Sequence, residues 1–240
     1  MNNNTDENKT IYLYNDDIGR VDLIDYMGTD LTITNAARVS FGVTKDQLDN
    51  RDKKLIKYLV KHRHTSTFEH NVVTFRFVVP MFVRSQHMRH RTWAYNEISR
   101  RYTDKDLQFY TPKTFRTQHE TNRQASNLDE INPVVVPDLA DFGEGKRADL
   151  AVKSHVRNSL ELFNTLMREG VCREQARMVL PQNLYTEYYG TVSLLNALKF
   201  ISLRDKPEAQ WEIQVVAQAM LKMMEELWPE AIGAYREANW

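Results

Sequence analysis

The sequence predicts an α+β fold in which a mixed or antiparallel sheet is flanked by helices and followed by a helical second half. Two observations carry this prediction: β-branched and aromatic runs dominate the first half, whereas apolar residues recur at helical spacing through most of the second. Strand-rich and helix-rich segments that follow one another along a chain are typical of α+β proteins. The 240 residues fit one large domain, and 42% of them are hydrophobic and available for a core.

Short strands are expected to alternate with helices in the first half of the chain. Residues 11–28 mix β-type runs with Asp and Gly turn signals, a pattern that predicts a strand or hairpin. The run VVTFRFVV predicts a strand that ends at Pro80. Helices are expected, from apolar spacing and cap residues, at 31–41, 52–62 and 81–91. Thr34 or Asn35 would cap the first of them, whereas the polar residues 1–10 would form a disordered tail.

The second half is expected to be helical apart from one strand and one long insertion. Helices are predicted at about 148–169, 173–180, 193–203 and 207–227, with a short one at the carboxyl end. Between them LYTEYYGTV, rich in Tyr and Thr, predicts a strand. Residues 117–147 are polar, contain Pro133 and Pro137, and have no sustained period, so they predict a surface insertion. The predicted organisation is therefore a tail, 1–10, and a single domain, 11–240, that carries this insertion.

Composition limits the classes of function and location. Lys plus Arg and Asp plus Glu both total 32, and a net charge of zero disfavours a protein that grips nucleic-acid phosphates. The only cysteine, Cys172, has no partner for an intramolecular disulfide, which favours a reducing compartment. The amino terminus is not basic and then apolar, and no apolar run approaches the ~18 residues of a membrane span. We therefore expect a cytoplasmic protein that engages neither nucleic acid nor membranes.

The segment RHRTWAYNEISRRY concentrates cations around a small polar core. Arginine has a planar fork that grips phosphate or carboxylate oxygens through two bonds. Arg89 and Arg91 lie two residues apart and could serve two neighbouring anionic groups. Glu97, Ser99 and Arg101 alternate, so in an extended segment they would share one face. The alternative is a solvated surface whose aromatic side chains pack on the core. The spacing indicates anion binding, of the kind a nucleotide monophosphate needs, and no particular reaction.

Five segments in this chain resemble those of the flavin-dependent thymidylate synthases. The run RHR followed by seven residues and a Ser, with NEISRRY around it, is similar to the signature of that family. The other segments are AARVSF, HRHTSTFEH, CREQARMVLPQNLYT and SLRDKPEAQWEI. All five appear in the family's order between residue 36 and about 214. A chance match to one short pattern is common, but a colinear set is not, so the chain is identified as a member of this family.

The resemblance implies an enzyme with the fold of this family that methylates dUMP to dTMP. It implies 5,10-methylenetetrahydrofolate as the carbon donor, NADPH as the reductant through bound FAD, and a homotetramer with shared active sites. Arg204 would be the catalytic residue that contacts the uracil ring and favours its N3-ionised form. The residues that would bind dUMP are Gln86, Arg89, Glu97, Ser99, Arg100, Arg101, Arg177 and Arg204. The residues that would bind the cofactors are His64, Ser66, Glu69, Arg89, His90, Arg91, Asn96 and Glu97.

The chemistry of these residue types is consistent with that reaction. Carbon-5 of uracil is a weak nucleophile, and a fixed guanidinium near the ring carbonyls stabilises the negative charge that develops on activation. Cys172 is expected to be a buried packing residue rather than a nucleophile. The histidines His62, His64 and His70 lack the spacing of a metal site. The chain also lacks a Gly-rich phosphate loop, so side chains must hold the flavin.

The family pattern is broken at positions that bear on the flavin. The helix before SLR usually carries Asn-x-Arg and a further Asn in this family, but Ser193, Leu195 and Lys199 stand there in this chain, and no flavin contact is assigned to them. Arg100 stands where a small residue is typical and would be strained if its φ were positive. Two alternatives stay open: a nucleic-acid-binding module built on the Arg-rich segment, and a divergent member that has lost affinity for FAD.

Overall fold

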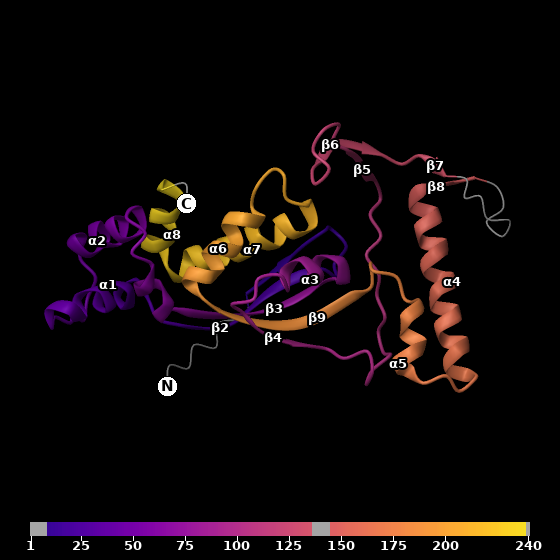
Figure 1. Cartoon of the computed structure of the whole chain (residues 1–240), viewed down its shortest axis with the longest axis horizontal. Helices are drawn as coiled ribbons and strands as arrows, with labels where there is room; N and C mark the ends of the chain where they lie inside the picture. Colours follow the sequence, from indigo (N-terminus) through magenta and orange to yellow (C-terminus); the bar gives the residue numbers. More distant parts are fainter. Residues whose placement is uncertain (1–8, 136–144, 239–240) are drawn as a thin grey trace. The chain divides into compact units, whose positions relative to one another are not determined.

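A computed structural model describes residues 9–135 and 145–238 of the chain. They form two compact units whose segments interleave along the sequence (Figure 1). The first unit comprises residues 1–78, 87–96 and 188–240, and the second comprises residues 79–86 and 97–187. Helices together with antiparallel strand pairs confirm the predicted α+β class. The predicted domain boundaries stay a prediction, and most of the expected tail lies outside the described residues.

Five strands are hydrogen-bonded in the order β1-β2-β3-β9-β4. Their bounds are Thr10–Tyr12 for β1, Arg20–Met27 for β2, Val72–Pro80 for β3, Ala94–Glu97 for β4 and Tyr185–Ser193 for β9. β2 pairs antiparallel with both β1 and β3, so the hairpin predicted at 11–28 is confirmed, as is the strand that ends at Pro80. Val73, Phe75 and Phe77 are fully buried while the residues between them are not, because successive strand residues point to opposite faces.

The helices of the first unit pack an apolar core against these strands. Their bounds are Asp30–Arg38 for α1, Asn50–Lys61 for α2, Leu194–Arg204 for α6, Trp211–Leu227 for α7 and Pro229–Glu237 for α8, with short 3-10 turns η1 at Val39–Phe41 and η2 at Thr65–His70. α7 lies against α6, α8 and β2, and α2 lies beside α8 (Figure 1). Trp228 is completely buried, and its indole Nε1 donates a 3.0 Å hydrogen bond to the carbonyl of Gly28.

The predicted cap of the first helix is wrong. α1 begins after Thr29, not at Thr34 or Asn35, which lie inside the helix. The reason is a long-range contact: the carboxylate of Asp30 accepts 3.0 Å hydrogen bonds from the backbone N–H groups of Glu230 and Ala231, at the start of α8. The first turn of α1 is therefore fixed by these residues about 200 positions away and also by a local cap, in which the Thr29 N–H donates a 3.0 Å bond to the Thr32 hydroxyl.

The second unit contains α3 at Met81–His87, α4 at Ala148–Arg168, α5 at Arg173–Ala176, the 3-10 turn η4 at Arg177–Val179, and four short strands. These strands are β5 at Phe115–Gln118, β6 at Ser126–Ile131, β7 at Val134–Val135 and β8 at Lys146–Arg147, and they pair antiparallel as β5–β6 and β7–β8. They fall largely in the predicted insertion, where no strand was expected because their side chains are mostly exposed and no apolar alternation marks them. Residues 136–144 of that insertion lie outside the described residues.

Two other helix predictions need correction. The helix expected at 81–91 ends at His87, so Arg89, His90 and Arg91 lie in a turn that is closed by a 2.9 Å bond from the His90 N–H to the His87 carbonyl. The helix expected at 173–180 breaks into α5 and η4. In the part of the chain that the structure describes, no helix is both long and apolar enough to cross a bilayer.

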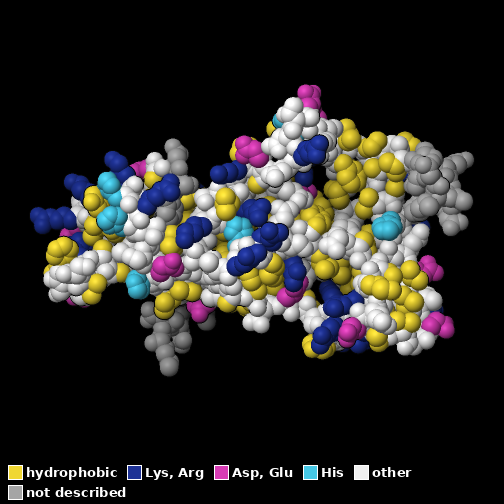
Figure 2. Space-filling view, in the orientation of Figure 1, with side chains coloured by type: hydrophobic (Ala, Val, Ile, Leu, Met, Phe, Trp, Pro, Cys, Tyr) yellow, Lys and Arg dark blue, Asp and Glu magenta, His cyan; other side chains and the backbone are white. Residues whose placement is uncertain are grey.

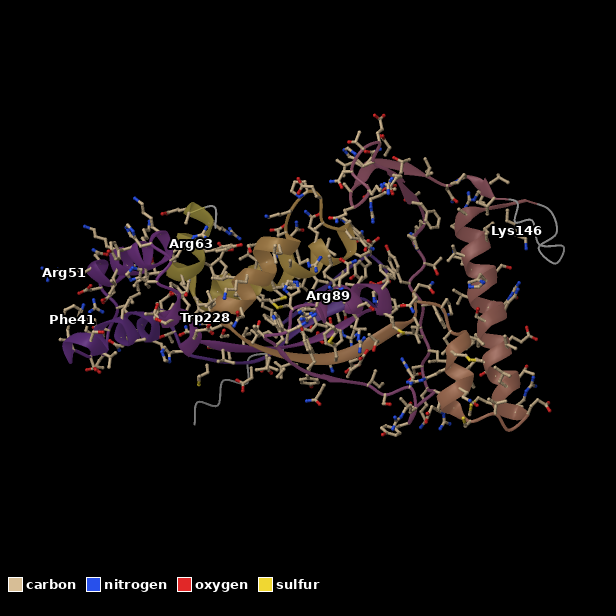
Figure 3. All side chains as sticks on the ribbon, viewed as in Figure 1. Phe41, Arg51, Arg63, Arg89, Lys146 and Trp228 are labelled. Atoms are coloured by element: carbon tan, nitrogen blue, oxygen red, sulfur yellow. The ribbon has the colours of Figure 1, made fainter. Side chains whose placement is uncertain are left out.

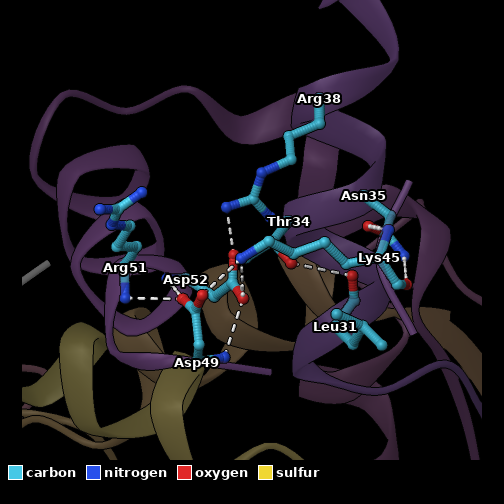
Figure 4. A network of polar contacts seen from close by, with 8 residues as sticks. All are labelled: Leu31, Thr34, Asn35, Arg38, Lys45, Asp49, Arg51 and Asp52. Atoms are coloured by element: carbon cyan, nitrogen blue, oxygen red, sulfur yellow. Dashed lines mark hydrogen bonds and ion pairs between the residues drawn. The ribbon is translucent and has the colours of Figure 1, made fainter. Parts of the chain in front are cut away.

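A network of charged side chains ties α1 to α2 in the first unit (Figure 4). Asp52 is completely buried and forms ion pairs with Arg38 of α1 and, at 3.0 Å, with Lys45 of the connecting loop. Its carboxylate also accepts a 2.8 Å bond from the backbone N–H of Asp49, the N-cap residue of α2. Burial alone would raise the pKa of Asp52, but these donors together hold the pKa below its usual value.

Asp52→Ala is expected to lower the free energy of unfolding by about 3 kcal/mol, because it leaves the Arg38 guanidinium and the Lys45 ammonium without their buried counter-ion. Urea denaturation followed by circular dichroism measures the change. Asp46→Ala is the matched control, since Asp46 is an exposed acid of the same loop. Equal denaturation midpoints for the two variants would contradict the stabilising role of the network.

Candidate functional site

The turn that carries Arg89, His90 and Arg91 is anchored on buried aromatic rings of the first unit. His87 is 1% exposed, and its Nδ1 lies 2.8 Å from the hydroxyl of Tyr188, which is equally buried. The Tyr95 hydroxyl donates to the backbone carbonyls of His87, at 3.0 Å, and His90, at 3.1 Å. These contacts fix the turn that follows His87, in which Figure 3 labels Arg89.

Arg204 and His90 contact each other directly. The Nε–H of Arg204 donates to Nε2 of His90 over 3.1 Å. Because an arginine nitrogen can only donate, Nε2 carries no proton and the neutral ring holds its proton on Nδ1. Phe200 lies one turn before Arg204 in α6, and its ring packs on His90 with centroids 4.8 Å apart. Helical spacing therefore brings both residues to the same histidine.

Electrostatics keep His90 neutral. Burial, followed by the charge of Arg204, lowers the pKa of His90 to about 4. Burial and the neighbouring charge of Arg89 also lower the pKa of Arg204, although a guanidinium stays protonated in proteins. Arg89 and Arg91 are exposed, and among the described residues neither has an acidic partner. This surface of the first unit is therefore locally positive, although the whole chain is neutral.

Acid is expected to destabilise the protein through His87 and His90. Burial holds the pKa of both below the ordinary 6.5, far below for His87 and to about 4 for His90. Between pH 6.5 and about 4 the unfolded chain therefore binds protons that the folded chain does not, so stability is complete above pH 6.5 and falls as the pH drops toward 4. Melting temperatures measured across this range should fall less steeply for His90→Asn than for the unchanged protein. His70→Asn, at an exposed histidine, is the control, and a His90→Asn slope equal to that of the control would contradict this origin.

The other cofactor residues predicted in the first unit are exposed. His64, Ser66 and Glu69 lie in or next to η2, and Asn96 lies on β4. The ring of His64 packs edge-on against Tyr58 with centroids 5.8 Å apart.

The three positions that depart from the family pattern have separate roles in the structure. The hydroxyl of Ser193, which also caps α6, donates a hydrogen bond to the carboxylate of Glu69. Leu195 belongs to the core at 3% exposure. Lys199 is exposed, and its ammonium donates to Asn196 Oδ1 over 3.4 Å. Only Lys199 therefore offers a cation to a ligand.

In the second unit, Glu97 is held by two neighbours. Its Oε2 accepts two hydrogen bonds from Arg84, one of them from Nε at 2.9 Å, and its Oε1 accepts one from the Thr186 hydroxyl at 2.7 Å. The three side chains line a pocket of about 140 Å³, as do the predicted dUMP residues Arg100 and Arg177. The pocket is completed by Met81, Ile98, Leu184 and Tyr185. The pocket has three guanidinium groups and a single carboxylate, so it suits an anionic group.

The remaining dUMP residues predicted in the second unit do not line this pocket. Gln86 is half-buried on α3, and Ser99 and Arg101 lie in a turn closed by a 3.0 Å bond from the Tyr102 N–H to the Ser99 carbonyl. The expectation that Glu97, Ser99 and Arg101 share an extended face is therefore wrong, because β4 ends at Glu97. Arg101 is exposed and donates to the Tyr102 hydroxyl at 3.0 Å.

Arg100 is not strained, since its φ is not positive. Its guanidinium donates to the backbone carbonyls of Lys105, at 3.1 Å, and Tyr185, at 3.3 Å. The side chain therefore fastens its own loop and reaches the pocket from there.

Sequence reasoning missed Arg84 and Thr186. An arginine inside the apolar run MFVRSQ was the available signal for Arg84, because a charge in such a helix usually has a fixed partner. The expectation for Cys172 is also wrong: the thiol is exposed at the N-cap of α5, with Sγ 3.7 Å from Gln175 Oε1. Across residues 9–135 and 145–238, no three His, Cys, Asp or Glu side chains gather as a metal site would require.

Comparison with known proteins gives the relationships of the chain. A family model described as "Thymidylate synthase complementing protein" matches residues 22–230. The flavin-dependent thymidylate synthase of Thermus thermophilus is 42% identical over 224 residues, which cover 92% of this chain and 77% of that protein. The corresponding enzyme of Thermotoga neapolitana is 39% identical over 224 residues, 91% of each chain. The crystal structure of the UMP/dUMP methylase PolB from Streptomyces cacaoi, bound with 5-Br dUMP, has a TM-score of 0.75 at 30% identity and covers 90% of this chain and 94% of its own.

Proposed function

The chain belongs to the flavin-dependent thymidylate synthases and methylates dUMP to dTMP with a flavin, and we propose how its residues divide that reaction. The observation that carries the assignment is the hydrogen bond between Arg204 and His90. It joins the arginine expected to activate uracil to a histidine of the segment expected to hold FAD. In this proposal 5,10-methylenetetrahydrofolate is the carbon donor and NADPH the reductant.

Arg204 activates the pyrimidine. Its Nε–H donates to His90, which orients the guanidinium, and the guanidinium donates to a uracil carbonyl when the nucleotide is bound. A fixed positive charge at that carbonyl stabilises the N3-ionised ring and the negative charge that makes carbon-5 nucleophilic. His90 serves this purpose because it is neutral at physiological pH, so it accepts the bond and adds no repulsion. No cysteine is required for this activation.

The donor set of the first unit fits FAD. Arg89 and Arg91 are exposed guanidinium groups without acidic partners among the described residues, and the Nδ1–H of neutral His90 adds a third donor. Guanidinium forks match phosphate oxygens, of which FAD carries two linked groups. We assign His64, Ser66, Glu69 and Asn96 to the same cofactor side, with Glu69 oriented by Ser193. When bound, FAD would supply the redox chemistry, and these residues would hold and orient it.

Residues of the second unit are also assigned to dUMP. We assign an anionic group of dUMP to Arg84, Arg100 and Arg177, and a donor group of the nucleotide to Glu97. Arg84 and Thr186 fix the Glu97 carboxylate, so its remaining acceptor sites have a set direction. Gln86, Ser99 and Arg101 are assigned to the same nucleotide on the resemblance alone.

The homotetramer is also a proposal. It is supported by large apolar side chains that the second unit exposes, among them Leu128 at 92% and Met178 at 77%. Sedimentation equilibrium of the purified protein measures the mass of the assembly.

We also propose a cytoplasmic location, because a chain with a single cysteine forms no intramolecular disulfide and suits a reducing compartment.

Incubation of the protein with dUMP, 5,10-methylenetetrahydrofolate, NADPH and FAD tests the proposed function. We expect dTMP to form and its formation to stop when any one of the four is omitted. A preparation that binds FAD and dUMP yet forms no dTMP would overturn the proposal.

A further inference from the structure

A groove of about 510 Å³ lies between α2 and α8 in the first unit, at the carboxyl ends of both helices. Lys57, Lys61 and Arg63 line it together with one acid, Glu237. Glu237 forms a 2.8 Å ion pair with Lys57, whereas Lys61 and Arg63 have no acidic partner among the described residues. Figure 2 shows Lys and Arg side chains gathering over this end of the first unit. The groove therefore carries uncompensated positive charge.

Arg63 occupies a backbone position that suits glycine. Its φ is 55°, in the left-handed region that is unfavourable for residues with a Cβ. The turn is closed by backbone bonds, from the Arg63 N–H to the Val60 carbonyl at 3.1 Å and from the His64 N–H to the Leu59 carbonyl at 2.9 Å. Nothing in this turn requires the arginine side chain, which is exposed beside α2 (Figure 3). A residue with a Cβ at a left-handed position where glycine would be less strained points to a function of its side chain.

The groove adjoins the segment assigned to the cofactor side. His64 follows Arg63 directly, and its ring rests against Tyr58 of α2, between the two lysines in sequence. Lys57 and Lys61 are one helical turn apart, which separates their Cβ atoms by about 5–6 Å. The groove is thus lined by two cations one turn apart on α2 and by a third in the turn that follows, and such a set suits a linear ligand with repeated anionic groups.

We propose that this groove binds the poly-γ-glutamate tail of the folate co-substrate. The inference rests on the proposed function, which makes a folate the carbon donor. A folate tail carries one free α-carboxylate for each added γ-linked residue, so successive carboxylates meet Arg63, Lys61 and Lys57 in turn. The phosphate groups of NADPH are anionic like the carboxylates of the tail and could also bind cations. They are clustered in the molecule, however, whereas the carboxylates of the tail are spaced along a chain. The two sources are separated by experiment.

The test compares the binding of pteroylmonoglutamate and pteroylpentaglutamate to the FAD-loaded, full-length protein at low salt. We expect the pentaglutamate to bind about tenfold more tightly, since each exposed ion pair contributes modestly. Lys61→Ala and Arg63→Gly should each reduce that ratio by about twofold to threefold, and together they should remove most of it. Arg63→Gly also relieves the left-handed φ, so its melting temperature should be unchanged or higher. Lys54→Ala, an exposed cation of α2 outside the groove, should keep the full ratio.

Two results would overturn the proposal while the proposed function stands. One is dTMP formation and folate binding that do not depend on tail length. The other is an unchanged ratio of pentaglutamate to monoglutamate affinity in the variant that combines Lys61→Ala and Arg63→Gly. If that variant also had a raised KM for NADPH, the groove would belong to the reductant. Failure of the monoglutamate itself to bind or to support dTMP formation would overturn the proposed function, and this inference with it. A tail-length ratio that disappears at high salt would support the ionic origin.

Discussion

Arg204→Ala is expected to lower the turnover number for dTMP formation by about 100- to 1000-fold while the fold is retained. Arg204 is half-buried and its guanidinium is oriented by the hydrogen bond to His90, so we expect its charge to act on the ring of the substrate. Its removal leaves the negative charge that develops on uracil without a fixed counter-charge. Steady-state assays with saturating dUMP measure the loss, and circular dichroism checks the fold.

Two further measurements separate activation from simple loss of charge. Arg204→Lys keeps a cation but lacks the Nε donor that contacts His90, so we expect it to recover only a small part of the turnover. Lys206→Ala, an exposed cation just after α6, is the matched control and should be fully active. In Arg204→Ala the pKa of His90 should rise, which proton NMR detects. Near-normal turnover of Arg204→Ala would contradict the activating role.

Arg84→Ala is expected to weaken dUMP binding by roughly 10- to 100-fold, the effect of losing charge-assisted hydrogen bonds. Arg84 donates two bonds to Glu97 and lines the same pocket. Without it, the Glu97 carboxylate loses its orientation and repels an anionic group. Equilibrium titration with dUMP measures the affinity. Arg84→Lys should bind with intermediate affinity, because it keeps the charge and loses the fork.

The control for this prediction is Arg157→Ala, which removes an exposed arginine of α4 in the same unit. Its dUMP affinity should be unchanged. If Arg84→Ala bound dUMP as tightly as Arg157→Ala, the pocket around Glu97 would not be a nucleotide site.

The fold was predictable where burial leaves a pattern. Phe75 and Phe77 alternate with polar residues in β3, and the apolar spacing of α7 gave its range to within a few residues at the amino end. The strands β5 and β6 were missed because neither alternates buried with exposed side chains: β5 is mostly half-buried and β6 mostly exposed. The start of α1 was missed because Thr29, Thr34 and Asn35 are all usual cap residues, and the contact of Asp30 with α8 that favours the earlier start is not visible in the local sequence.

The candidate site was predictable in its residue types but not in its pairings. The family segments named Arg89, His90 and Arg204, yet only the structure brings Arg204 Nε to His90 Nε2. That contact joins residues 114 positions apart, and it decides the tautomer of the histidine. Arg84 escaped notice because it belongs to no quoted motif. Glu97 was named, but a sequence does not show which cation will hold a carboxylate.

We propose that the protein carries FAD at the Arg-His-Arg turn and acts there on dUMP. The most direct test is the visible absorption spectrum of the purified protein after incubation with FAD and gel filtration, recorded before and after addition of dUMP. We expect a retained flavin band that shifts when dUMP binds. A colourless protein, or a flavin band that does not respond to saturating dUMP, would contradict it.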